Sequence, residues 1–282
     1  MKVTYKTGRE KLALSITILT RHPQKMRIQV YDSIRPNSFY TDREGTVSGK
    51  RVFIVKMPVS PDQAIIRIFN TKHGDLPKGQ DPTYKVEKIE RVPLKTYGCI
   101  NLNDPAIKDW IEFSREWADK AGWLSAGPHT DVSHGGSTYI SNDGRYRIDY
   151  FDELIDWERN ITNRQGIIIP NPNYGKPLAT PFRIGSKTGI IQASKKKVMK
   201  YTIPQRWVLL DHEFSHGNVN ENPSDEFEAD KNGIKLSLST GTPKIEVQNG
   251  WLEVFRGTPS DLNVRRHKAL SNYIENFEKL CK

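Results

Sequence analysis

Short runs of alternating or β-branched apolar residues recur through the first third of the chain, and turn-forming clusters separate them. Alternation with a period of two predicts β-strands, here at residues 14–19, 26–31, 51–57, 64–69 and 84–89. Turns are predicted at residues 35–38, 42–45 and 74–79. No helical period interrupts this stretch. We therefore expect residues 1–98 to form a β-sandwich-like domain.

The pattern changes after residue 98. Asp104 and Pro105 mark a helix start, and apolar residues then recur at helical spacing as far as Gly122. A hairpin is predicted at 139–150, followed by strands at 166–169 and 189–193. Helices are predicted at 195–201, 204–217, 223–239, 244–255 and 261–280. The sequence therefore predicts an α+β fold, in which residues 99–282 form a second domain with a small mixed sheet and helices.

Composition narrows the class of protein. Apolar residues make up 36% of the chain and charged residues 27%, the balance of a folded protein. No stretch approaches the roughly 18 consecutive apolar residues of a membrane span. The first 19 residues are interpreted as a strand and not as a signal peptide, because no small-residue cleavage site follows them. We therefore expect a cytoplasmic protein without a membrane span.

Charge and cysteine content add two expectations. The two cysteines, Cys99 and Cys281, are too few for a disulfide framework and fit a reducing compartment. The net charge of +10 suggests an acidic partner surface. The densest basic run, at 195–200, has no interleaved aromatic residues and lies in no nucleic-acid-binding module. It is interpreted as a solvated helix face, so no specific nucleic-acid partner is expected.

The helix predicted at 204–217 carries the pattern H-E-x-x-H. His212 and His216 are four residues apart, so they share one helix face and can each turn a ring nitrogen toward one metal ion. Glu213 is rotated away from these two ligands but can reach a water on that metal, which is the position of a general base. Five-residue matches of this kind also occur by chance, so a second element is needed.

That second element begins ten residues after His216, at Glu226. Its helix start is predicted at Asn222 and Pro223. Glu226 and Asp230 are four residues apart, so one can ligate a metal while the other accepts the N–H of a metal-bound histidine. The alternative is a solvated acidic helix start, because carboxylates favour first turns. The conjunction with H-E-x-x-H favours the metal site.

Glu226, and not Glu228, is the predicted ligand, because the two lie about 200° apart around the helix axis and only one can face the metal. Glu226 shares its face with Gly233, whose missing side chain lets this helix approach the histidine-bearing helix closely. Glu228 is instead expected on a solvated side, paired with Lys231 and Lys235.

H-E-x-x-H at 212–216 followed by E-x-x-A-D at 226–230 resembles the gluzincin metallopeptidases, the thermolysin-like group and its smaller relatives. The likeness extends over residues 100–280 in architecture but is specific only at 202–243. It implies Zn²⁺ as cofactor and a minimal zincin domain. Carried over by position, it implies His212, His216 and Glu226 as zinc ligands, Glu213 as general base and Asp230 as the partner of His212.

A narrower likeness concerns the run 201–204, the short gap between the two motifs, and Ala229-Asp230 with Gly233 and 241–243. These features are similar to zincin-type proteins of crAss-like phages of gut bacteria, which are uncharacterised or virion-associated. The likeness implies a phage protein associated with the virion in an infected host cell. It also implies that the β domain contacts other virion proteins.

Two further polar groups are candidates. A transition-state oxyanion needs a donor such as Tyr, His or Arg, and His267 is the candidate, with a surface histidine as the alternative. In some gluzincins a histidine precedes a proline in this region, and Thr258 occupies that position here. His129 and His134 flank Asp131 in a loop, which is either a second metal site or, as favoured, an ordinary polar loop.

Two functions from different classes remain open. The first is a zinc-dependent endopeptidase, in which Glu213 deprotonates a zinc-bound water that attacks a peptide lying against an edge strand near 189–193. The second is a structural protein of a virion tail or collar, built on a zincin fold with zinc mainly stabilising. The intact Glu213 favours catalysis, because a structural site needs no general base. The lack of a clear transition-state donor favours the second function.

Overall fold

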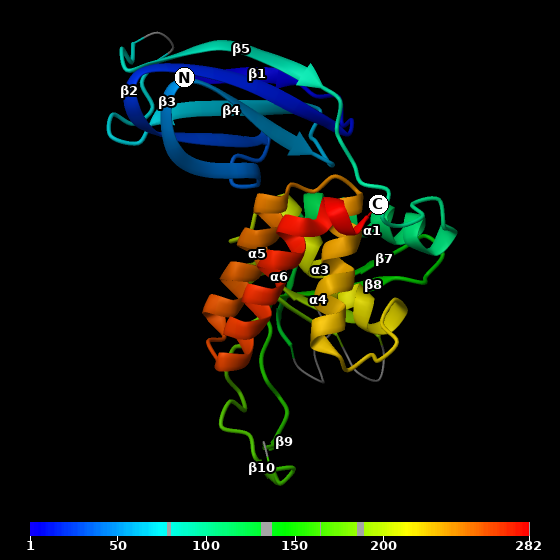
Figure 1. The fold of residues 1–282 in the computed structure, drawn as a ribbon. Helices are drawn as coiled ribbons and strands as arrows, with labels where there is room; N and C mark the ends of the chain where they lie inside the picture. Colours follow the sequence, from blue (N-terminus) through cyan, green and yellow to red (C-terminus); the bar gives the residue numbers. More distant parts are fainter. Residues whose placement is uncertain (78–79, 131–136, 164, 185–188, 282) are drawn as a thin grey trace.

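The computed structural model describes residues 1–77, 80–130, 137–163, 165–184 and 189–281. An antiparallel β-sheet lies at one end of the molecule, and helices with a second, mixed sheet form the remainder (Figure 1). The antiparallel sheet contains β1 (Lys2–Lys6), β2 (Leu12–Asp32), β3 (Phe39–Met57), β4 (Gln63–Asn70) and β5 (Tyr84–Val92). The mixed α and β composition agrees with the sequence prediction.

Strand β2 organises the first sheet. It pairs with β3 along most of its length, with β5 through Ala13–Thr20 and with β4 through Met26–Asp32. The register with β3 shifts between Thr20 and Gln24, beside Pro23, which has no N–H to donate. The strands predicted at 14–19 and 26–31 are therefore one strand. All five strands belong to one hydrogen-bonded sheet, so the two separate sheets of a sandwich are not seen in the described residues.

The turn predicted at 42–45 is wrong, because these residues lie inside β3. Asp42 accepts hydrogen bonds from Arg27 Nε (2.7 Å) and Gln29 Nε2 (3.0 Å), both on β2. Polar residues that suggest a turn in the sequence are thus used for pairing between neighbouring strands.

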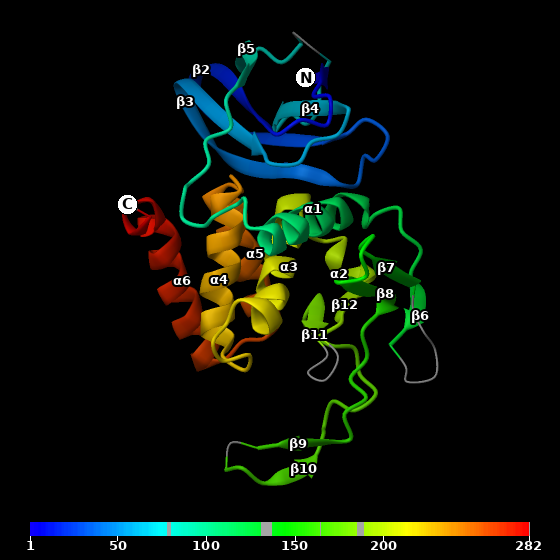
Figure 2. The ribbon, with the colours of Figure 1, turned by 90° about the vertical axis from the view of Figure 1, so that its right-hand side faces the viewer.

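The second sheet is mixed and has the order β11-β12-β8-β6, with β7 also paired to β8. Its strands are β6 (Gly127–His129), β7 (Ser137–Ile140), β8 (Arg147–Glu153), β11 (Phe182–Ile184) and β12 (Ile191–Ser194). Strand β12 lies between β11 and β8, so the strand expected at the edge near 189–193 is internal, and β11 is the edge. A separate hairpin of β9 (Asn160–Thr162) and β10 (Ile168–Pro170) projects away from the body (Figure 2).

The helices are α1 (Pro105–Lys120), α2 (Lys195–Val198), α3 (Ile203–Asn218), α4 (Glu226–Ser239), α5 (Lys244–Gly257) and α6 (Asp261–Leu280). Asp104 caps α1 as predicted, accepting from the Ala106 N–H. Thr202 and Gln205 form a reciprocal capping box at the start of α3. Helix α3 packs against α1, α4 and α5. Within the part of the chain that the structure describes, no helix combines the length and apolarity needed to cross a membrane.

Helix α4 begins at Glu226 and not at the predicted Asn222–Pro223. Asp225 is the capping residue, and its carboxylate accepts from the backbone N–H groups of Phe227 and Glu228. Asn222 and Pro223 therefore belong to the loop between α3 and α4, where the Pro223 carbonyl has another partner, described below.

A buried carboxylate joins the first sheet to α3. Glu246 of α5 is only 1% exposed. It accepts from Thr41 Oγ1 of β3 (2.8 Å), from Thr202 Oγ1 (2.9 Å) and from Gln205 Nε2 (2.9 Å). These bonds satisfy a charge that would be costly to bury alone, and they fix the start of α3 relative to β3.

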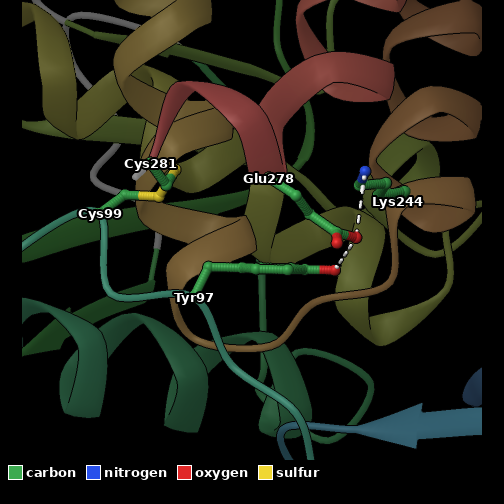
Figure 3. The surroundings of a disulfide bond; sticks show 5 residues. All are labelled: Tyr97, Cys99, Lys244, Glu278 and Cys281. Atoms are coloured by element: carbon green, nitrogen blue, oxygen red, sulfur yellow. Dashed lines mark hydrogen bonds and ion pairs between the residues drawn. A yellow bond between two sulfur atoms is a disulfide. The ribbon is translucent and has the colours of Figure 1, made fainter.

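Cys99 and Cys281 form a disulfide, with their Cα atoms 4.9 Å apart (Figure 3). The bond ties the segment after β5 to the end of α6. Beside it, the Tyr97 hydroxyl donates to Glu278 (2.8 Å), which also pairs with Lys244 (3.4 Å). The sequence pattern did not predict this pairing. The fold brings together two residues 182 positions apart, which their spacing in the sequence cannot reveal.

Candidate metal centre

Two histidines and a glutamate of α3 converge on one point. One ligand-type atom from each of His212, Glu213 and His216 lies within 4.8 Å of the others. Nε2 of His212 is 3.2 Å from Nε2 of His216. Both histidines are buried, whereas Glu213 is partly exposed. The i, i+4 spacing on a helix thus gives the convergence that the sequence predicted.

Helix α4 brings Glu226 to the same point. Its carboxylate oxygens lie 3.6 Å from His212 Nε2 and 3.6 Å from His216 Nε2. Ligand atoms about 2.0–2.1 Å from a zinc ion at tetrahedral angles are separated by about 3.3 Å. The three atom pairs therefore have nearly the spacing of ligands around one ion, and the group fits a metal with two nitrogen ligands and one oxygen ligand.

The other ring nitrogens face oxygen atoms. His216 Nδ1 is 2.7 Å from the Pro223 carbonyl oxygen, and His212 Nδ1 is 3.1 Å from Asp230 Oδ1. The second contact is short enough for a hydrogen bond, but it does not have the geometry of one. An Nδ1–H directed at these oxygens leaves the Nε2 lone pair of each ring facing the common point. Sequence reasoning anticipated Asp230 but missed Pro223, because a carbonyl leaves no signature in the sequence.

Arg266 of α6 binds two of the three carboxylates of α4, Glu226 and Asp230. Its Nε and Nη2 each lie 2.8 Å from an oxygen of Asp230, which is fully buried, and Nη2 is 3.2 Å from Glu226. Burial alone lowers the pKa of Arg266, but the bonds to Asp230 and the charge of Glu226 outweigh it, so the pKa is raised. This two-point contact fixes the carboxylate that faces His212.

The candidate donor His267 lies one residue beyond Arg266 but does not line the cleft above the metal site. Its ring centroid is 6.0 Å from that of Phe255. The Arg266 guanidinium lies against the same ring, with its Cζ 5.2 Å from the ring centroid. Arg266 and Asn263 of α6 do line this cleft.

The cleft has a volume of 490 Å³, and His212, Glu213 and His216 line it. The edge strand β11 lines it on one side. Helix α5 contributes Trp251, Val254 and Phe255. The cleft therefore runs along β11, the strand at the end of the second sheet (Figure 2 shows the position of β11).

The electrostatics of Glu213 suit proton transfer. Burial raises the pKa of its carboxyl to about 7, and the charge of Glu226 acts in the same direction. His212 and a backbone hydrogen bond from Ile184 of β11 oppose this rise. A carboxyl with a pKa near neutrality can both accept and release a proton at ordinary pH.

Asp211 is a residue that sequence reasoning missed. Its buried carboxyl accepts from Trp110 Nε1 of α1 (2.9 Å) and from Ser237 Oγ of α4 (2.6 Å). Burial raises its pKa to about 7, although both hydrogen bonds lower it. Asp211 thereby links the three helices α1, α3 and α4 directly behind His212. Its place just before H-E-x-x-H is the only signal the sequence offers.

The expected partners of Glu228 are wrong. Its carboxylate accepts from the backbone N–H groups of Glu221 (2.9 Å) and Asn222 (3.2 Å), so it closes the loop between α3 and α4. Lys231 instead lies over the Phe227 ring. The helical pattern predicted that Glu228 would point away from the metal site. It could not predict that the loop between α3 and α4 would return to the first turn of α4 and supply the partners of Glu228.

The other candidate metal loop is described only in part. His129 ends β6, and its ring centroid is 6.1 Å from that of Trp157. Asp131 and His134 lie outside the described residues. Among the residues that the structure describes, the metal-type group of at least three side chains is the one on α3.

No protein-family model, no curated protein and no solved structure matches the chain. The resemblance to gluzincins therefore rests on the motif residues themselves.

Proposed function

We propose that the chain is a zinc-dependent endopeptidase. The observation that carries the proposal is the convergence of His212 Nε2, His216 Nε2 and the Glu226 carboxylate, with Glu213 beside them in an open cleft. Two imidazoles and one carboxylate with space for a further ligand are the donor set of catalytic zinc sites. A purely structural zinc site would need no adjacent carboxylate in the position of a general base.

The residues of the chain would divide the chemistry between them. His212, His216 and Glu226 would hold Zn²⁺, which would supply Lewis-acid polarisation of the scissile carbonyl and lower the pKa of a water. Glu213 accepts the proton of the attacking water and delivers it to the leaving amine. Asp230, held by Arg266, keeps the His212 ring in the tautomer whose Nε2 can bind metal.

Strand β11 is the element against which a peptide would bind. Its inner side pairs with β12, and within the described residues no strand pairs with its other side, which lines the cleft and where the Ile184 N–H is bonded to Glu213. An extended peptide can add to such an edge through backbone hydrogen bonds, which bind main chain irrespective of sequence. This arrangement suits an endopeptidase, because both ends of the peptide can extend beyond the cleft.

The test combines metal analysis with a single isosteric substitution. Protein purified without chelator should contain close to one zinc per chain, and it should cleave unfolded protein substrates. Glu213→Gln should keep the zinc and the fold but lose hydrolysis, because only the proton acceptor is removed. Glu275→Gln, at an exposed position on α6, is the matched control and should retain full activity. A wild-type protein that binds zinc but cleaves no substrate would contradict the proposal and favour a structural role for the metal.

A further inference from the structure

A second cavity lies beside the cleft, between the start of α4 and the first half of α6. Its volume is 630 Å³, and we call it the α4–α6 groove. Phe227, Leu262 and Ala269 give it an apolar lining, with Arg265 and Arg266 beside them. The α6 residues follow the spacing i, i+3, i+4 and i+7, so they form one stripe on one face of that helix.

The groove adjoins the cleft. Ser224, Glu226 and Arg266 line both cavities, so they form a shared rim. Arg266 is held at this rim by its contacts with Glu226 and Asp230. A chain that occupies the cleft therefore reaches the groove by crossing only these three residues.

Two exposed apolar residues of α6 differ in their surroundings. Leu262 is 58% exposed and Val264 is 68% exposed. A single exposed apolar side chain is ordinary on a protein surface, and Val264 lines neither cavity. Leu262 lines the groove together with the half-buried Phe227 and with Ala269. The groove therefore offers a grouped apolar surface, whereas Val264 lies outside both cavities.

We propose that the α4–α6 groove binds an apolar side chain of the same peptide that lies in the cleft, several residues from the cleaved bond. The inference rests on the proposed function and names a substrate class for it: extended peptides with leucine or phenylalanine at a fixed distance from the scissile bond. Burial of one such side chain corresponds to roughly a tenfold gain in kcat/KM. A peptide too short to span the rim gains nothing.

The experiment compares long and short capped alanine–serine peptides in which leucine replaces one serine at a time. Zinc-loaded wild type, Leu262→Asp and the matched control Val264→Asp are assayed, and cleavage sites are mapped by mass spectrometry. An acidic residue in the first turn of a helix is favourable, so the helix is retained in Leu262→Asp. Wild type and Val264→Asp should prefer long peptides with leucine at one position by roughly tenfold, and Leu262→Asp should lose this preference. Ala269→Trp, which fills the groove, should act in the same way.

Each outcome decides the inference. An equal preference for leucine-containing long peptides in wild type and Leu262→Asp would contradict the proposed role of the groove. It would leave the proposed peptidase activity unaffected. If zinc-loaded wild type cleaves no peptide, the proposed function fails, and the binding of the same peptides is measured by fluorescence anisotropy. Weaker binding of the leucine peptides by Leu262→Asp than by Val264→Asp then supports the groove, and equal binding overturns it.

Discussion

Gly233 of α4 packs directly on the backbone of His212. A Cβ atom at position 233 would lie 2.7 Å from the His212 nitrogen and 2.9 Å from its Cα, distances that no ordinary contact reaches. The close approach of α4 to α3 places Glu226 and Asp230 within reach of the histidine rings. The sequence predicted this use of Gly233, and the structure confirms the close approach.

Gly233→Ala should push α4 away from α3 and weaken metal binding, although alanine is normally the better helix residue by roughly 1 kcal/mol. The backbone atoms in its path cannot move aside as a flexible side chain would. The matched control is Gly217→Ala in α3, where a Cβ would meet only Ile184 Cδ1 at 3.8 Å. Thermal unfolding is measured with and without zinc. The rise in unfolding temperature that zinc produces should be smaller in Gly233→Ala and unchanged in Gly217→Ala. Unchanged zinc affinity in Gly233→Ala would mean that the two helices separate without disturbing the site.

The three carboxylates of α4 should differ in their effect on zinc affinity. Glu226→Ala should weaken binding most, because it removes a proposed ligand. Asp230→Ala should cost roughly 10–100-fold, as partners of metal-bound histidines usually do. Glu228→Ala should leave the affinity nearly unchanged but destabilise the loop at Glu221 and Asn222 by about 1–2 kcal/mol, because two backbone N–H groups lose their acceptor. Competition titrations with a zinc chelator rank the variants, and the assignment fails if Glu228→Ala ranks first.

Whether the sequence could predict an interaction depends on how far apart its residues are along the chain. The i, i+4 spacing of His212 and His216 and the caps of α1 and α3 depend on neighbours within one helical turn, so pattern alone predicts them. The Cys99–Cys281 bond and the pairing of Arg266 with Asp230 depend on where distant segments meet. No local pattern encodes such contacts. The internal position of β12 is missed for the same reason, since strand order is a property of the whole sheet.

Arg266 should stabilise the fold as well as the site. Its removal would leave the fully buried Asp230 without its cation, and breaking a buried ion pair costs about 3 kcal/mol or more. Arg266→Lys should recover only part of this loss, because an ammonium cannot contact both Asp230 oxygens as the planar guanidinium does. The exposed neighbour Arg265 provides the control, and Arg265→Lys should be neutral. Urea unfolding of the zinc-free proteins measures the effect, and equal stability of the two variants would refute it.

Asp211 should make the stability of the zinc-free protein fall as the pH rises. Folding raises the pKa of its carboxyl from 3.8 to about 7, so the folded state binds more protons than the unfolded state between these two values. The raised pKa of Asp211 therefore adds to the free energy of unfolding. This contribution is fully present below about pH 4 and is lost as the pH rises to about 7. The loss is on the order of 4 kcal/mol.

Asp211→Asn should therefore flatten this dependence and make the protein more stable than wild type at pH 8. An asparagine can still accept from Trp110 with its oxygen and can donate to Ser237 Oγ with its amide, so both bonds survive the substitution. Glu213, whose pKa is also raised, contributes in the same direction in both proteins. The difference between wild type and variant consequently isolates Asp211. Urea unfolding of chelator-treated protein from pH 5 to pH 8 provides the measurement, with the exposed Asp62→Asn as control. Parallel curves for wild type and Asp211→Asn would show that the carboxyl is already ionised at pH 5 and that Trp110 and Ser237 stabilise its charge more than burial penalises it.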